Sequence, residues 1–314
     1  MRKALVVGFN NYPEYPLSGC VNDALKIATV LERDSDGAPN FSIKTLTDDK
    51  YPVTKSMLRS AIEDLFAGDS DVALFYFSGH GMVTSTGGTI VTPDFKSYDE
   101  GISMDDILKL ANKSKVRDKI IILDCCHAGA FGNPLVDNNT SFLSEGMTVL
   151  TASRSNESAI EINGSGVFTA LVVDALYGGA SDLRGFVTPG SIYSYVDSAL
   201  GPWEQRPVFK TNVTRFTHLR RVNPPVPLEV LRELPKYFET PESEFQLDPS
   251  FEYTHESAVE ENVQVFKKLQ KMFSVGLIVP CGEEYMYFAA INSKACRLTA
   301  LGYHYWRLAK ESRL

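Results

Sequence analysis

The sequence predicts an α/β protein: a mostly parallel sheet with helices on both faces, followed by a small C-terminal α+β module. Two observations lead to this fold class. Through about residue 220, short apolar runs alternate with amphipathic helical stretches, a pattern typical of parallel sheets covered by helices on both faces. Near Val222 the composition changes, because residues 223–227 are rich in proline and residues 239–250 are acidic.

The individual elements follow from two different periods of apolar residues. Strands are predicted where apolar residues are continuous or alternate, at residues 4–7, 42–46, 72–77, 119–123, 147–150 and 207–211. Helices are predicted where apolar residues recur every three or four positions, at residues 21–31, 54–66, 104–110, 167–176 and 189–200. In a parallel sheet of this kind, reactive groups gather in the loops that leave the carboxyl ends of the strands.

The change in composition predicts a second, smaller domain. We expect a first domain at residues 1–221, a proline-rich and acidic linker at residues 222–254, and a winged-helix-like domain at residues 255–314. Its predicted elements are a helix at residues 257–273, a turn at 276–280, a strand at 285–291 and a closing helix at 299–308.

Composition and charge exclude several classes of protein. With 44% hydrophobic and 22% charged residues the chain is globular, and no stretch approaches the roughly 18 unbroken apolar residues of a membrane span. The net charge of −8 and the pI of about 5.3 argue against nucleic acid or an anionic membrane as the main partner. Too few apolar residues follow the basic start for a signal peptide, so we expect a cytoplasmic protein.

Two predicted strand ends carry residues suited to nucleophilic catalysis. Residues 72–77 are followed by Ser-Gly-His-Gly, which holds His80 between glycines. Residues 119–123 are followed by Asp-Cys-Cys-His-Ala-Gly, which places two cysteines before a turn of small residues. The odd total of five cysteines indicates a reduced compartment rather than a disulfide framework. A cysteine in such a loop becomes a nucleophile when a nearby histidine takes its proton. For the histidine motif alone, a loop histidine without a role is the alternative.

Together the two motifs resemble those of caspase-like cysteine peptidases, closest to the metacaspases and stand-alone prokaryotic caspase homologues. The motifs are Tyr-Phe-Ser-Gly-His-Gly at residues 76–81 and Asp-Cys-Cys-His-Ala-Gly at residues 124–129. Supporting stretches lie, in order, at residues 19–23, 46–49, 151–157, 166–169 and 205–207, so the resemblance covers roughly residues 1–215.

The resemblance implies a role for each motif residue. Cys126 matches the nucleophile of the metacaspase motif, whereas Cys125 occupies a position usually held by a small residue. His80 matches the general base and acid. The backbone N–H groups of Cys126 and Gly81 match the oxyanion hole. Because nothing in the sequence points to a third member, we expect a catalytic dyad.

The resemblance also implies a pocket for a basic substrate residue. Asp23 and Asp124 match its two acidic positions, and Cys20 and Ser78 match positions that line it. Two carboxylates at the base of a slot would bind arginine or lysine in charge-assisted hydrogen bonds. The alternative is that Asp23 caps its helix and Asp124 orders the turn that follows it.

Calcium is the one ion that the resemblance suggests. Asp94, Asp105 and Asp106 match aspartates of calcium-activated metacaspases, but the fourth carboxylate falls near Asn133. Aspartates at the start of a helix are also ordinary helix-terminal residues. We therefore expect no required cofactor, with Ca²⁺ as the candidate activator.

Activation and partners follow from the same comparison. Residues 127–153 contain no lysine or arginine, so an enzyme selective for basic residues does not process itself there. A zymogen would then be activated by self-cleavage elsewhere in the chain, or by an upstream protease, an ion or a regulatory protein.

Residues 223–314 carry 10 Lys and Arg against 13 Asp and Glu, a net charge of −3, which argues against DNA binding.

The sequence therefore predicts a cysteine endopeptidase that cleaves proteins after arginine or lysine. The resemblance implies use as a prokaryotic stress or antiviral-defence effector. Two alternatives stay open. One is an inactive caspase-fold scaffold that acts through its C-terminal module, and the other is a transcriptional regulator that uses a winged helix.

Overall fold

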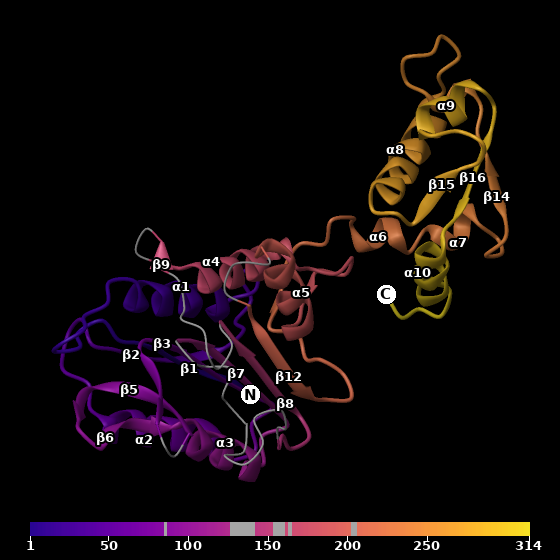
Figure 1. Ribbon diagram of the computed structural model, residues 1–314. Helices are drawn as coiled ribbons and strands as arrows, with labels where there is room; N and C mark the ends of the chain where they lie inside the picture. The colour runs from indigo at the N-terminus through magenta and orange to yellow at the C-terminus, as the bar shows by residue number, and fades with distance from the viewer. Residues whose placement is uncertain (85–86, 126–141, 153–160, 163–164, 202–205) are drawn as a thin grey trace. The chain divides into compact units, whose positions relative to one another are not determined.

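The computed structural model describes residues 1–84, 87–125, 142–152, 161–162, 165–201 and 206–314 (Figure 1). The chain divides into two compact units. The first comprises Met1–Ser181 and Phe186–Val222, and the second comprises Asp182–Gly185 and Asn223–Leu314.

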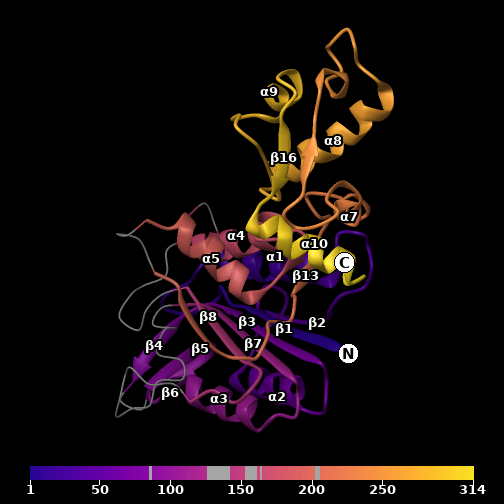
Figure 2. The ribbon, with the colours of Figure 1, turned by 90° about the vertical axis from the view of Figure 1, so that its right-hand side faces the viewer.

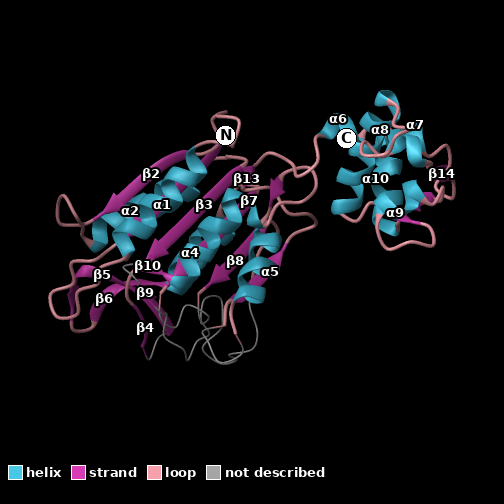
Figure 3. Ribbon diagram, turned by 90° about the horizontal axis from the view of Figure 1, so that it is seen from above, coloured by secondary structure: helices cyan, strands magenta, loops and turns pink. Residues whose placement is uncertain are grey.

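The first unit is built on a sheet of six strands in the order β12-β8-β7-β3-β1-β2 (Figure 3). They are β1 (Arg2–Gly8), β2 (Ser42–Thr47), β3 (Val72–Ser78), β7 (Asp118–Asp124), β8 (Met147–Thr151) and β12 (Val208–Asn212). All neighbouring pairs are parallel except β12 with β8, which is antiparallel. The prediction of a mostly parallel sheet is confirmed, and the carboxyl ends of β1, β3 and β7 meet at one edge.

Helices cover both faces of this sheet, as predicted (Figures 1 and 2). One face packs against α1 (Cys20–Glu32), α4 (Val167–Asp174) and α5 (Pro189–Ala199). The other face packs against α2 (Lys55–Phe66) and α3 (Met104–Lys113). Because side chains alternate along a strand, β1, β3 and β7 contribute apolar residues to both cores.

Short strands that the sequence did not predict follow His80 directly. β4 (Gly81–Thr84), β5 (Gly87–Lys96) and β6 (Asp99–Ser103) form a separate antiparallel sheet in the order β4-β5-β6. Ile90 and Ile102 of this sheet are buried in the core beneath α2 and α3. Two small antiparallel pairs complete the unit: β9 (Glu161–Ile162) with β10 (Ser165–Gly166), and β11 (Phe186–Val187) with β13 (Arg220–Arg221).

The second unit places a three-stranded antiparallel sheet, in the order β14-β16-β15, among helices. Its elements are α6 (Leu228–Leu231), α7 (Leu234–Tyr237), β14 (Glu244–Gln246), the 3₁₀ turn η3 (Pro249–Phe251), α8 (Glu260–Ser274), β15 (Ile278–Pro280), α9 (Met286–Ile291), β16 (Ala295–Leu298) and α10 (Ala300–Lys310). The long predicted helix and the closing helix are present as α8 and α10. The winged-helix assignment stays a prediction.

Two expectations for this region are wrong. Residues 222–254 are no linker, because Val226, Leu231, Phe238 and Leu247 are buried in the core of the second unit. Their proline and acidic content marks turns and exposed positions rather than a chain between domains. The predicted strand at residues 285–291 is the helix α9, and short apolar runs of this kind do not distinguish the two structures.

Among the described residues, no helix is both long and apolar enough to cross a membrane.

Candidate active site

The ends of β3 and β7 bring the histidine motif beside the first residues of the cysteine motif. Ser78 pairs with Asp124 in the parallel register, and the Gly79 N–H donates to the Asp124 carbonyl oxygen at 3.3 Å. His80 lies two residues beyond Ser78, and Cys126 lies two residues beyond Asp124 in the sequence. Cys126, including its backbone N–H in the predicted oxyanion hole, lies outside the described residues. The described strand ends approach in a register that fits a histidine–cysteine pair.

The ring of His80 is oriented by a backbone carbonyl. Its Nε2 lies 2.7 Å from the carbonyl oxygen of Tyr15. A carbonyl oxygen only accepts hydrogen bonds, so this contact requires a proton on Nε2, and a neutral imidazole with that proton has Nδ1 as its acceptor. Sequence reasoning expected a dyad, whereas the structure adds the Tyr15 carbonyl as a third group.

Tyr12 holds the backbone of the same histidine. Its hydroxyl accepts from the His80 N–H at 3.1 Å and donates to the Val91 carbonyl oxygen at 3.2 Å. The two rings meet edge to face with centroids 4.5 Å apart. Burial raises the pKa of the Tyr12 hydroxyl well above its ordinary value, so the group stays neutral and keeps its donor proton. The His80 carbonyl in turn accepts from the Val91 N–H at 2.9 Å.

The loop after β1, which carries Tyr12 and Tyr15, is fixed from both sides. The Asn10 side-chain oxygen accepts from the backbone N–H groups of Cys20 and Val21 at 3.0 and 3.3 Å, which satisfies donors at the start of α1. The buried Asp48 accepts from the backbone N–H groups of Asn10 and Asn11 at 2.8–3.1 Å. The sequence does not predict these roles, because residue type alone gives no sign of them. Their place after a parallel strand, at the edge of the sheet that carries His80, was the only signal.

Gly81, the second predicted oxyanion donor, opens β4 opposite Ile90. This register keeps the backbone after His80 extended beside the β3 end. A glycine at position 79 is also required, because a Cβ there would lie 2.5 Å from the Tyr12 hydroxyl. The donor role of the Gly81 N–H stays a prediction.

Cys125 is a core residue. Its side chain is 1% exposed and packs in the cluster between the sheet and α2 and α3. The preceding Asp124 points to the opposite face, where Thr169 of α4 donates to its Oδ2 at 2.6 Å. A buried thiol of this kind is structural, in line with the prediction that Cys126 is the nucleophile.

Asp23 and Asp124, the two predicted pocket acids, lie around one point. A Cβ at Gly166 would lie 2.3 Å from Asp124 Oδ2 and 3.3 Å from Asp23 Oδ2. Asp23 also accepts from the Gly166 N–H at 2.8 Å and from the Ser165 hydroxyl. Both carboxylates bond to residues 165–169. The alternative that Asp23 caps its helix and Asp124 orders the turn after it stays open, since that turn lies outside the described residues.

The other two predicted pocket residues lie on the same side of the sheet. Ser78 is 2% exposed at the end of β3, and Cys20 is 8% exposed at the start of α1. Below them, Tyr76 bonds to Thr169 at 2.6 Å. Burial, and then the negative charges of Asp124 and Asp23, raise the pKa of the Tyr76 hydroxyl well above its ordinary value. The described structure therefore gathers Cys20, Ser78 and both acids at one end of β3.

The three candidate calcium ligands have contacts within the chain. Among the described residues, no group of three or more His, Cys, Asp or Glu side chains is arranged to hold a metal. Asp94 accepts from the Lys55 N–H at 2.9 and 3.1 Å, at the start of α2. Asp105 and Asp106 lie in the first turn of α3. The fourth position, Asn133, lies outside the described residues, so the calcium assignment stays a prediction.

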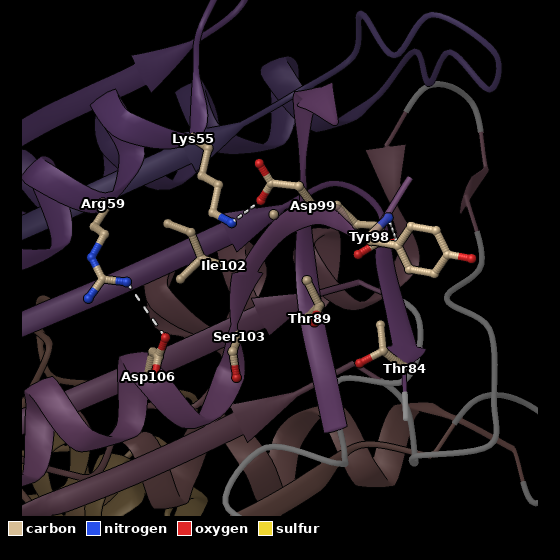
Figure 4. A pocket seen from close by; sticks show the side chains of 11 residues that line it. Lys55, Arg59, Thr84, Thr89, Tyr98, Asp99, Ile102, Ser103 and Asp106 are labelled. Carbon is tan, nitrogen blue, oxygen red and sulfur yellow. Dashed lines mark hydrogen bonds and ion pairs between the residues drawn. The ribbon is translucent and has the colours of Figure 1, made fainter. Parts of the chain in front are cut away.

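The chain supplies its own cations beside Asp106 (Figure 4). Arg59 and Lys109 each pair with this carboxylate at 3.6 Å, and Lys55 pairs with Asp99. All of these residues except Lys109 line a polar pocket of about 330 Å³ between α2, α3 and the β4–β6 sheet. A calcium ion would have to compete with an arginine and two lysines here.

A parallel α/β sheet with histidine and cysteine motifs at neighbouring strand ends defines a caspase-type cysteine peptidase as a class. The family model "Caspase domain" matches residues 1–217, so the chain belongs to the caspase-domain family of cysteine-type peptidases.

Individual relatives agree with this family. The chain is 32% identical to metacaspase-9 of Arabidopsis thaliana over 146 residues, 41% of this chain and 43% of the relative, so it spans less than half of that protein. A Geobacter sulfurreducens structure, protein GSU0716, covers 71% of this chain and 100% of its own, with 17% identity and a TM-score of 0.51. Caspase-1 from Spodoptera frugiperda covers 71% of this chain and 91% of its own, with 12% identity and a TM-score of 0.51. At these identities the two structures support the fold alone.

Proposed function

We propose that this chain is a cysteine endopeptidase that cleaves proteins after arginine or lysine. The observation that carries the specificity is the convergence of Asp23 and Asp124 on one point beside the ends of β3 and β7. A basic side chain would neutralise two buried carboxylates, whereas an acidic one would meet two like charges. Use of this activity in stress or antiviral defence stays an implication of the family resemblance.

In the proposed reaction, His80 Nδ1 takes the proton of the Cys126 thiol, and the thiolate attacks the carbonyl carbon of the scissile bond. The Tyr15 carbonyl holds the Nε2–H, which supports a ring orientation in which Nδ1 would face the thiol before substrate binds. The N–H groups of Gly81 and Cys126 stabilise the oxyanion. His80 then gives its proton to the leaving amine, and water hydrolyses the thioester.

Substrate binding would use the carboxylates of Asp23 and Asp124, each of which offers about four lone-pair sites. Asp124 Oδ2 accepts from Thr169, and Asp23 accepts from Ser165 and Gly166. The guanidinium of arginine presents a planar fork of donors that reaches both carboxylates, and the lysine ammonium acts as a point charge. Arginine is therefore the expected better substrate.

The test is turnover of matched fluorogenic peptides that end in Arg, Lys, Asp or Leu. We expect Arg and Lys peptides to be cleaved and Asp peptides to be rejected. Asp23→Asn should lower turnover of Arg peptides by roughly ten- to a hundredfold, the value of one charge-assisted bond of about 1.5–3 kcal/mol. Asp69→Asn is the matched control, since Asp69 is exposed in the loop before β3. Equal rates on Asp and Arg peptides, or an Asp23→Asn enzyme unchanged on Arg, would refute the specificity.

A further inference from the structure

A groove on the second unit is lined by hydrogen-bond donors. It measures about 540 Å³ and runs along the C-terminal half of α8. The residues that line it are Val230, Gln264, Lys267, Lys268, Gln270, Lys271 and Ser274. No carboxylate is among them. Lys267 and Lys271 are exposed, and neither takes part in an ion pair among the described residues, whereas Lys268 pairs with Glu233 at 2.7 Å. We call this surface the lysine groove.

An acidic surface lies on the same unit. Residues 239–261 contain no lysine or arginine. Glu242, Glu244 and Asp248 are exposed along and beside β14, which is an edge strand of its sheet. We call these three residues the acidic ridge. No ion pair of the described residues joins the ridge to the groove, so within one copy the two surfaces do not neutralise each other.

The two surfaces match in charge. Lys267 and Lys271 are one helical turn apart, which separates them by about 6 Å along the helix. Glu242 lies in the turn before β14, and Glu244 is the first residue of that strand, so the two carboxylates are two residues apart. The ridge can therefore bring a pair of carboxylates to the pair of ammonium groups.

We propose that the second unit is a self-association surface in which the acidic ridge of one copy lies in the lysine groove of the next. Such a contact joins two different patches, so it repeats from copy to copy and builds a ring or an open chain. A nucleic acid fits the groove less well. Glu260 and Glu261 begin the same helix, and a specific DNA interface buries about 1,000 Å² or more of largely positive surface.

The experiment is sedimentation velocity of the full chain over a range of protein concentrations, at low ionic strength and at about 0.5 M salt. We expect concentration-dependent association that is about tenfold weaker in high salt, because exposed ion pairs are screened. Lys267→Glu/Lys271→Glu should leave monomers, and so should Glu242→Lys/Glu244→Lys. Mixing these two charge-reversed variants should restore association, since each then offers a complementary surface to the other.

Lys294→Glu/Arg307→Glu is the control, because both positions are exposed on the same unit and the change in net charge is identical. It should associate like the unmodified chain. The proposal is overturned if the unmodified chain is monomeric throughout, or if the control loses association as the groove variant does. Failure of the mixture to associate would also overturn it. So would a monomer that binds duplex DNA at physiological salt through Lys267 and Lys271. None of these readouts depends on peptidase activity, so the proposed function is tested separately.

Discussion

Asp23 and Asp124 come from α1 and β7, yet both border the position that a side chain of residue 166 would occupy. A Cβ there would lie 2.3 Å from one carboxylate oxygen and 3.3 Å from the other. Only glycine fits, because a hydrogen leaves the space that the carboxylates need. The backbone N–H of this residue donates to Asp23 at 2.8 Å, which ties the start of α4 to α1.

Gly166→Ala should therefore damage stability and substrate binding together. The methyl group must displace the buried Asp124 carboxylate, and overpacking of this kind costs about 1–3 kcal/mol. We expect a lower melting temperature and at least a tenfold loss of turnover on Arg peptides. Ser165→Ala is the matched control, because it removes one hydrogen bond to Asp23 without adding bulk. An alanine variant with unchanged melting temperature and Arg turnover would contradict this account of the pocket.

The adjacent cysteines should differ sharply in reactivity. We expect Cys126→Ala to abolish peptide cleavage and Cys125→Ala to leave most of it, since Cys125 is 1% exposed in the core. Iodoacetamide followed by peptide mapping should label Cys126 in the native protein and spare Cys125. Cys296 is an internal reference, because burial raises the pKa of its thiol to about 12 and keeps it unreactive. Preferential labelling of Cys125, together with an inactive Cys125→Ala enzyme, would show that Cys125 is the nucleophile.

The sequence predicted the centre of the main sheet well because the strands there are buried. β3 and β7 show as apolar runs. The β4–β6 sheet gives no comparable signal, since its hairpin is rich in glycine and threonine and β4 is only partly buried. Composition misled at residues 222–254, where Leu231, Leu234 and Phe238 are buried at a helical spacing among prolines and acidic residues.

The candidate site was predictable only where residue type carries the chemistry. His80 and Asp124 stand in recognisable motifs at strand ends, and Asp23 stands in one at the start of α1. Tyr15 acts through its backbone carbonyl, which any residue would supply. Tyr12 acts through a hydroxyl that reaches His80 from a different loop. Contacts of these two kinds depend on how the loop after β1 folds back across the sheet edge, and spacing along the chain does not reveal that.

Calcium should not be strictly required for activity. Asp106 already has Arg59 and Lys109 as partners, and Asp94 accepts two bonds from the Lys55 N–H. We expect most peptide cleavage to survive a calcium chelator. The opposite result would be full loss of peptide cleavage in chelator, with recovery in micromolar calcium that the Asp105→Ala variant lacks. It would show that these acids form an activating site despite their present partners.

Tyr12→Phe should slow catalysis without moving its pH dependence. The substitution removes the acceptor of the His80 N–H and the donor to Val91, and it leaves a buried N–H unpaired at a cost of about 1–3 kcal/mol. If His80 shifts as a result and the barrier rises by the same amount, turnover falls by roughly five- to a hundredfold. Burial holds the pKa of Tyr12 well above its ordinary value, so the hydroxyl does not titrate where the enzyme is stable, and the pH profile of kcat/KM should keep its shape.

Tyr15→Phe is the control, since only the backbone carbonyl of that residue contacts His80 and its side chain is exposed. It should match the unmodified enzyme. An unimpaired Tyr12→Phe enzyme, or a shifted alkaline limb, would mean that the hydroxyl does not act by positioning His80.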